Sequence, residues 1–273
     1  MSGRWGVGLA AALLMLWFAV PVVPILVWSF ADQWRFPAVL PQQWGLRGWA
    51  LAADEGLVPA LMRSLGLGSV VAVLAVALGL GTGRTLARRS SAPGSRWRFL
   101  LAVLLLAPVA LPPFALAMGL DVLLLRWRVP DAVALVVLLT VFALPYTTYT
   151  LRAGFLSLDA ELEDQARMLG ASRSTAFLRV TLPALAPTVM VATFLAFLIG
   201  WSDYIVTAVV TGGQFTTLPV LIGSAASRIG NEPLLGVLSL VSVGVPLTLL
   251  LLSGSIMRRT VTRSTAKGGS HAV

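Results

Sequence analysis

Charged side chains with a regular spacing gather in one polar stretch of this chain, residues 158–183. Four apolar residues in its first part recur at spacings of four, four and three, which places them on one face of a helix: Leu158, Leu162, Ala166 and Leu169. The charged residues fall on the other faces: Glu161, Glu163, Asp164 and Arg167. The stretch therefore predicts a short amphipathic helix with acids in its first turn, where the helix dipole favours negative charge.

A second short helix is predicted directly after the first. Asp159 can cap the start of the first helix, and Gly170 is placed to end it in a left-handed backbone conformation. Ser172 can cap the second helix, which carries three apolar residues on one side: Ala176, Phe177 and Val180. Pro183 then bars simple continuation, because it lacks a backbone donor and its ring clashes with the preceding turn.

Residues for acid–base, nucleophilic or metal chemistry are otherwise scarce. The chain has no cysteine, its one histidine is His271, the third residue from the C-terminus, and its one lysine is Lys267. The phosphate-binding pattern Gly-x4-Gly-Lys-Ser/Thr is absent. A membrane-embedded enzyme would need clustered His, Asp or Glu at helical spacing, which the sequence lacks. We therefore expect no enzymatic activity, no metal site and no cofactor held by this chain itself.

The composition indicates an integral membrane protein. Of 273 residues, 58% are hydrophobic and only 11% are charged, and the mean hydropathy is +0.89. Soluble domains are about half apolar and about a quarter charged. The formal charge of +9 could suggest nucleic acid, but the arginines cluster at the ends of apolar windows, which favours a topological role in a lipid bilayer instead.

Six apolar windows are long enough to cross the membrane, at about residues 7–28, 61–83, 99–120, 132–151, 184–209 and 233–256. Five arginines and no acid lie between residues 84 and 98, and more basic residues lie in the tail 257–273, so we expect these segments and both termini to be cytoplasmic. The first window could instead be a signal peptide cleaved after Ser29-Phe-Ala31, but its uncharged run is too long for one. Residues 1–273 are thus predicted to form one transmembrane domain, with residues 157–183 on the inner face.

The polar stretch also resembles a known family motif. Asp164-Gln165-Ala166, then Gly170, then Val180-Thr-Leu-Pro183 is similar to the "EAA" loop of permease subunits in binding-protein-dependent ABC importers, with the pattern Glu-Ala-Ala-x3-Gly-x9-Ile-x-Leu-Pro. Asp replaces Glu and Gln replaces Ala, whereas the spacing from Gly170 to Pro183 is kept in full. The alternative is an ordinary amphipathic loop between two membrane spans. Three further segments are similar to the polyamine, thiamine and iron branch: the Trp-rich segment 32–60, Leu144-Pro145-Tyr146, and the Thr-Leu-Pro ending at Pro219.

The resemblance implies an all-α fold of the ABC type I importer permease, with six transmembrane helices and a cytoplasmic coupling helix in the loop between spans four and five. It implies a bacterial inner-membrane location, two ABC ATPase subunits that bind ATP-Mg, a second permease subunit in a heterodimer, and an external solute-binding protein. By the same resemblance, the residues that couple the chain to the ATPase are Glu163, Asp164, Gln165, Ala166, Leu169, Gly170, Ala171 and Pro183.

A candidate solute pathway rests on polar residues at membrane depth: Asp203, Trp201, Tyr204 and Tyr146. Asp203 could equally be an acid at the outer interface beside aromatic residues. The hydroxyls of residues 146–149 could face the pathway, or could satisfy carbonyls freed by Pro145. We expect a small polar solute, a polyamine-like cation first and a sugar or other organic solute second; the chain could also be an anchoring subunit that transports nothing.

Overall fold

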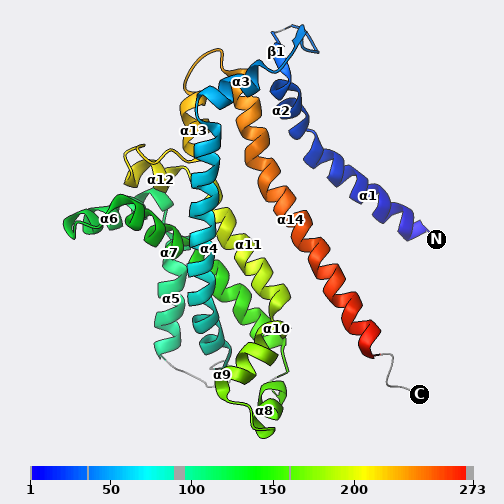
Figure 1. The fold of residues 1–273 in the computed structure, drawn as a ribbon, viewed down its shortest axis with the longest axis vertical. Coiled ribbons are helices and arrows are strands. Elements are labelled where there is room, and N and C mark those ends of the chain that lie inside the picture. The colour runs from blue at the N-terminus through cyan, green and yellow to red at the C-terminus, as the bar shows by residue number, and fades with distance from the viewer. Residues whose placement is uncertain (1, 36, 89–95, 160, 269–273) are drawn as a thin grey trace. The chain divides into compact units, whose positions relative to one another are not determined.

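The computed structural model describes residues 2–35, 37–88, 96–159 and 161–268, and most of them are helical. The helices in chain order are α1 (Ser2–Ala19), α2 (Val22–Ser29), α3 (Arg47–Asp54), α4 (Leu57–Arg88), α5 (Arg96–Ala110), α6 (Pro113–Arg126), α7 (Asp131–Ser157), α8 (Glu161–Met168), α9 (Arg173–Ala176), the π-helix η2 (Phe177–Thr181), α10 (Leu182–Ala184), α11 (Ala186–Ser202), α12 (Ile205–Val210), α13 (Leu218–Ala226) and α14 (Glu232–Gly268). Two short antiparallel strands, β1 (Ala31–Gln33) and β2 (Gln43–Trp44), form the one sheet among the described residues. Figure 1 labels most of these elements along the chain. The chain divides into two compact units, Met1–Arg63 with Thr216–Leu247 and Ser64–Phe215 with Thr248–Val273.

Five of the six predicted membrane windows fall on one helix or on one bent pair of helices, and the window 184–209 covers α11 and α12. Within the described part of the chain, three helices are long and apolar enough to span a bilayer unbroken, at Leu57–Arg88, Asp131–Ser157 and Glu232–Ser255. The number rises to six if each bent pair counts as one span, with bends of 44° between α1 and α2, 109° between α5 and α6, and 76° between the helical segment Arg173–Ala184 and α11. The part of the predicted tail at residues 269–273, which includes His271, and residues 89–95 of the arginine segment lie outside the described residues.

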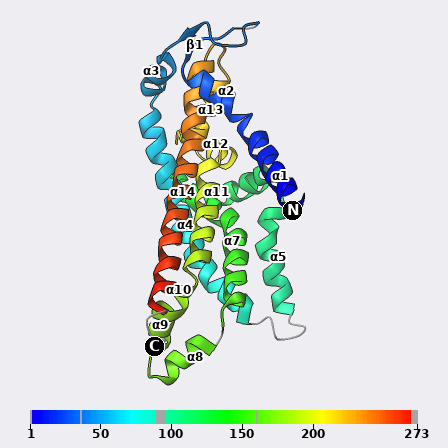
Figure 2. The same cartoon turned by 90° about the vertical axis from the view of Figure 1, so that its right-hand side faces the viewer.

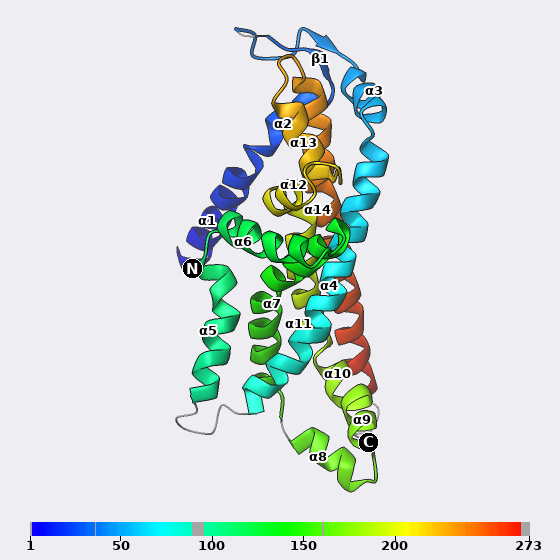
Figure 3. The same ribbon diagram turned by 90° about the vertical axis from the view of Figure 1, so that its left-hand side faces the viewer.

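Besides the bend between α1 and α2 in the window 7–28, two predicted windows are broken in the structure. The window 99–120 is not one straight helix, because Pro112 takes an extended conformation (ψ 128°) before Pro113 and the chain turns sharply into α6 (Figure 3). The window 184–209 ends early, since α11 stops at Ser202 and Asp203 is extended (ψ 125°) before the separate helix α12 begins. Proline and an extended acidic residue therefore convert two expected spans into broken ones.

The second unit is built around the close packing of α4, α7 and α11. Gly68 of α4 and Gly200 of α11 touch backbone to backbone, since a Cβ added at Gly200 would lie 2.9 Å from the Cα atom of Gly68. Thr147 of α7 is fully buried and donates a hydrogen bond of 3.0 Å to the carbonyl of Ala75 in α4. Two turns further along α4, the hydroxyl of Thr82 lies 2.8 Å from that of Thr148 in α7. These contacts hold the C-terminal half of α4 firmly against α7.

The first unit has more structure than the Trp-rich segment 32–60 suggested. That segment lies between two predicted membrane windows, and it contains most of the β1–β2 pair and all of α3. Residues 211–232, between the last two predicted membrane windows, contain α13. Arg228, after α13, forms an ion pair of 2.6 Å with Glu55, after α3, so the two segments are tied together.

Candidate functional site

The polar stretch forms the two short helices that its sequence predicts, and they make a hook beyond α7 (Figure 2). The Asp159 carboxylate accepts a hydrogen bond of 3.0 Å from the backbone of Glu161 and so caps α8, as expected. Ser172 accepts one of 3.2 Å from the backbone of Thr175 and caps α9. None of the eight residues of α8, all of them described, is buried.

Gly170 closes α8 with a Schellman turn. Its φ is +88°, in the left-handed region that glycine adopts at little cost. The Gly170 N–H donates to the Arg167 carbonyl at 3.0 Å, and the Ala171 N–H donates to the Ala166 carbonyl at 3.1 Å, which is the double hydrogen bond of that motif. The predicted left-handed helix end at Gly170 is confirmed. Ala166, Gly170 and Ala171 act here through their backbones.

The predicted effect of Pro183 is only partly right. The helix that begins at Arg173 does not end before Pro183; it continues through η2 and α10 to Ala184. The chain widens to π-helical geometry over Phe177–Thr181, with the Leu182 N–H bonded to the Phe177 carbonyl. A wider turn relieves the clash between a proline ring and the carbonyl four residues earlier, which explains why the helix survives. The break comes after Ala184, before α11.

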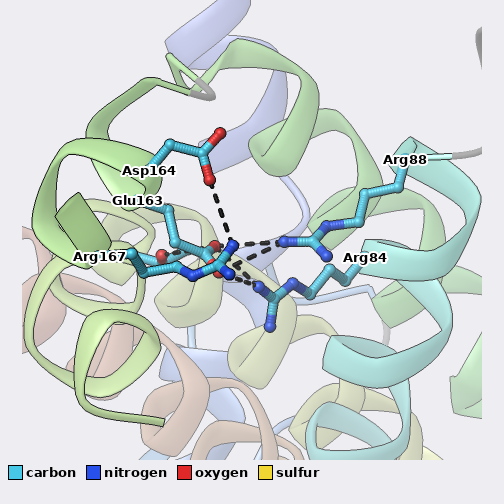
Figure 4. A network of polar contacts seen from close by, with 6 residues as sticks. Arg84, Arg88, Glu163, Asp164 and Arg167 are labelled. Carbon is cyan, nitrogen blue, oxygen red and sulfur yellow. Dashed lines mark hydrogen bonds and ion pairs between the residues drawn. The ribbon is translucent and has the colours of Figure 1, made fainter. Parts of the chain in front are cut away.

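Glu163 lies at the centre of a polar network that joins α8 to α4 (Figure 4). Arg84 of α4 donates to both carboxylate oxygens, at 2.5 and 2.7 Å, and Arg88 donates at 3.3 Å. The hydroxyl of Thr181 in η2 donates to the same carboxylate at 3.3 Å. The Arg84 guanidinium also lies 4.8 Å from the ring centre of Phe177, within cation–π range.

Asp164, the next residue, faces a different environment. Its side chain is 71% exposed, whereas that of Glu163 is 15% exposed. Its one ion pair among the described residues is to Arg167 of the same helix, at 3.4 Å (Figure 4). Gln165 is also exposed. The two neighbouring acids were predicted as members of one group; in the structure both line one cavity, but Glu163 is largely covered and Asp164 is largely exposed.

A cavity of about 530 Å³ lies beside this network. Leu158 and Leu162 line it together with Arg84, Arg88 and Glu163. Leu169 was predicted to continue the apolar face of Leu158 and Leu162, but it lies past the end of α8 and is 90% exposed. Met168 is 81% exposed beside it. The helix end at Met168 removes Leu169 from the face that the spacing predicted and places both side chains at the tip of the hook.

Sequence reasoning missed Arg84, Arg88 and Thr181 as members of the site. The two arginines were interpreted only as markers of the cytoplasmic side. Their spacing of four residues near the end of a long helix was a signal that both could reach one acid, but nothing in the sequence showed which acid.

A second cavity, of about 520 Å³, brings together three of the four predicted pathway residues: Tyr146, Asp203 and Tyr204. Its other polar lining residue is Ser202, and the rest are apolar. The Asp203 carboxylate accepts hydrogen bonds from the backbone N–H (2.8 Å) and hydroxyl (3.0 Å) of Thr207, so it also caps the first turn of α12. Asp203 therefore has a structural role in addition to its place at the cavity.

The other residues considered for the pathway are buried in the packing between helices: Trp201, Thr147 and Thr148. Trp201 is 1% exposed and stacks on Phe197 with ring centres 5.7 Å apart, and it does not line this cavity. Thr147 and Thr148 are fully buried and hydrogen-bond toward α4, as described above, while Tyr146 lines the cavity. Thr147 donates to the Leu144 carbonyl as well, at 3.0 Å. Of these three hydroxyl-bearing residues, Tyr146 thus lines the cavity and the two threonines lie in the packing between helices.

Comparisons with known proteins agree with the fold. One protein family, the binding-protein-dependent transport system inner membrane component, matches residues 75–267. A Salmonella typhimurium (strain LT2) protein named for 2-aminoethylphosphonate transport is 28% identical over 262 residues, 94% of this chain and 96% of that protein. The putrescine transport system permease protein PotI of Escherichia coli (strain K12) is 26% identical over 239 residues, 82% and 80% of the two chains. The structure of a bacterial ABC transporter involved in alginate import superposes with a TM-score of 0.64 at 13% identity, covering 93% of this chain and 96% of that one.

Proposed function

The chain belongs to the family of binding-protein-dependent transport system inner membrane components, and from this premise we propose that residues 157–183 couple it to a separate ATP-hydrolysing subunit. It is a permease subunit of an ABC transporter and is not an enzyme. The observation that carries the proposal is the tip of the hook, where Met168 and Leu169 are 81% and 90% exposed next to the left-handed turn at Gly170.

The tip has the features of a docking element. Large exposed apolar side chains beside an outward acid, Asp164, fit an interface with an apolar centre and a polar rim. The sequence has no phosphate-binding loop of its own, so ATP-Mg would bind to the partner. The coupling residues of this proposal are Asp164, Gln165, Ala166, Met168, Leu169, Gly170, Ala171 and Pro183.

The proposed assembly has two permease chains, two ATPase subunits and an external solute-binding protein. The second permease is an unlike chain, and both termini of this chain lie in the cytoplasm of a bacterial cell. Closure of the ATPase pair on ATP would move the hook, and the spans would alternate between inward and outward access. Solute delivered by the binding protein would then pass inward.

The proposed solute is a small polar compound with a protonated amine, a polyamine-like cation first. The cavity with Asp203, Tyr146 and Tyr204 offers one carboxylate and two aromatic rings, which suit an ammonium group. A 2-aminoethylphosphonate-like solute is the second candidate, supported by the relative that matches 94% of this chain. Sugar uptake, or no transport at all in a mere anchoring subunit, are the outcomes that would replace both.

The coupling proposal is tested by affinity purification of the complex from solubilised host membranes. A subunit that co-purifies should hydrolyse ATP, and its sequence should contain a phosphate-binding loop. We expect Leu169→Glu to weaken association by about tenfold or more, or 1.4 kcal/mol, because it puts a charge into an apolar contact. Val39→Glu is the control, since Val39 is equally exposed (87%) outside the hook. Association of the Leu169→Glu chain as tight as that of the unaltered chain would refute the contact.

The solute proposal is tested by uptake into proteoliposomes of the full complex with its binding protein, using putrescine, 2-aminoethylphosphonate and trehalose as probes. Asp203→Asn keeps an oxygen to cap α12 but removes the charge, so we expect about tenfold weaker apparent affinity for the amine, the size of a lost charged hydrogen bond. Asp131→Asn, at another helix start, is the matched control. Unchanged affinity in Asp203→Asn would leave Asp203 with its capping role alone.

A further inference from the structure

We propose that Glu163 and the two arginines of α4 form a fixed strut that transmits movement of the hook to the membrane helices. Glu163 and Arg84 are thus positioning residues for energy coupling, distinct from the residues that touch the ATPase. This inference rests on the proposed coupling function of residues 157–183, and it assigns Glu163 to a role inside the chain rather than at the partner contact.

Several hydrogen-bond donors meet the one carboxylate of Glu163. Glu163 accepts from Arg84 on both oxygens, from Arg88, and from the Thr181 hydroxyl. These donors come from two elements, α4 and η2. Arg88 of α4 lies 75 residues before Glu163 in the sequence, and Thr181 of η2 lies 18 residues after it. A carboxylate with this many charged and neutral donors has a fixed orientation, because any rotation breaks several hydrogen bonds at once.

Arg84 and Glu163 are largely shielded from water. The side chains of Arg84 and Glu163 are only 27% and 15% exposed, so water screens their attraction less than it would on an open surface. Arg84 also lies against the ring of Phe177, at 4.8 Å. Phe177 and Thr181 begin and end the π-helix η2, so that helix presents one residue to Arg84 and one to Glu163.

Apolar packing contributes little to fixing the position of α8. None of the residues of α8 is buried, and Leu162, on the side toward the cavity, is still 43% exposed. A helix without buried side chains has little apolar area to hold it in one position. The ion pairs are therefore the directional attachment between α8 and α4 within the described residues.

Arg84 adjoins the close packing of α4 against α7. Two residues before it, the Thr82 hydroxyl lies 2.8 Å from that of Thr148 in α7. Gly83 permits close approach, since a Cβ there would lie 3.0 Å from the backbone of both Arg152 and Thr148. A displacement of Glu163 is thus passed to Arg84 and, through this tight contact, from α4 to α7.

The experiment measures solute imported per ATP hydrolysed by the complete complex in proteoliposomes. We expect Glu163→Gln to lower this ratio about fivefold or more, a typical coupling between distant sites, while the ATPase stays associated. Glu161→Gln is the matched control, because it makes the same change on the same helix at an exposed residue with no ion pair among the described residues. The double variant Arg84→Glu with Glu163→Arg should recover part of the loss that each single charge reversal causes.

Three outcomes are informative. A ratio in Glu163→Gln equal to that of Glu161→Gln would overturn the strut. Loss of ATPase association in Glu163→Gln, with no recovery in the charge-swapped chain, would also overturn it and make Glu163 a direct partner contact. If the unaltered chain associates with no ATPase, the proposed function itself fails, which is a result distinct from the first two.

Discussion

Gly170 shows how one residue type sets the geometry of the hook. Its positive φ lets the Gly170 and Ala171 N–H groups bond back to the last turn of α8, which ends that helix and turns Leu169 outward. Apart from its two chain neighbours, no described residue has an atom within 4 Å of a Cβ placed at Gly170. Space therefore does not require glycine here; backbone conformation does.

This separation of space from conformation makes a sharp prediction. Gly170→Val should abolish most uptake and reduce ATPase association, since a left-handed L-residue costs about 1–2 kcal/mol and a β-branched one is a marked outlier. Gly170→Asn should keep most of both, because asparagine adopts this conformation more readily. The measurements are uptake and ATPase recovery at equal amounts of protein in the membrane. Equal activity of the valine and asparagine chains would show that the turn is not needed.

Adjacent residues on α8 were predictable in type but not in direction. Successive helical residues are about 100° apart, so Glu163 and Asp164 border the same cavity but differ in exposure, at 15% and 71%. The sequence could not decide which faces inward, because the deciding arginines lie 79 and 75 residues earlier in the chain. Local spacing identifies helices and their ends, whereas contacts between distant segments depend on the packing of α4 against α7.

At the scale of elements, the apolar windows predicted where helices lie, and proline and glycine decided their shape. The bend of 109° between α5 and α6 follows from consecutive prolines at 112 and 113, which sequence can locate but not orient. Close packing was also hidden from the sequence. Gly66 and Gly68 look alike in the same helix, yet a Cβ at Gly66 would meet nothing within 4 Å and one at Gly68 would lie 3.0 Å from the Phe197 ring.

The contact between α4 and α11 should therefore be sensitive to a single methyl group. In Gly200→Ala the new Cβ would lie 2.9 Å from the Cα of Gly68, a backbone atom that cannot move aside alone. We expect a loss of about 1–3 kcal/mol, typical of overpacking, seen as a lower apparent Tm in detergent. Gly66→Ala is the control and should be neutral or gain about 0.5–1 kcal/mol, as alanine is the better helix former. If both variants melt at the same temperature, the two helices are not as close as described.

At the scale of the whole molecule, the family match confirms the resemblance that the loop 164–183 predicted, and the fold is that of ABC transporter permeases. Composition and hydropathy predicted an integral membrane protein and the positions of its apolar windows, because both depend on hydropathy alone. They could not show that three of the windows are bent, or that the described contacts divide the chain into two units. One transmembrane domain over residues 1–273, and cytoplasmic termini, stay predictions.

The orientation of the chain can be tested with single cysteines, because the sequence contains none. Leu169 and Ile229 are suitable positions, since they are 90% and 103% exposed and the predicted topology puts them on opposite sides. In spheroplasts with an intact inner membrane, a membrane-impermeant maleimide should label Ile229→Cys and leave Leu169→Cys unlabelled. Inverted vesicles should give the reverse. Ser64→Cys, at a fully buried position, should stay unlabelled in both preparations and is the control for unspecific labelling. Labelling of Leu169→Cys from outside would place the hook where no cytoplasmic ATPase can reach it, and both the coupling proposal and the strut would fail together.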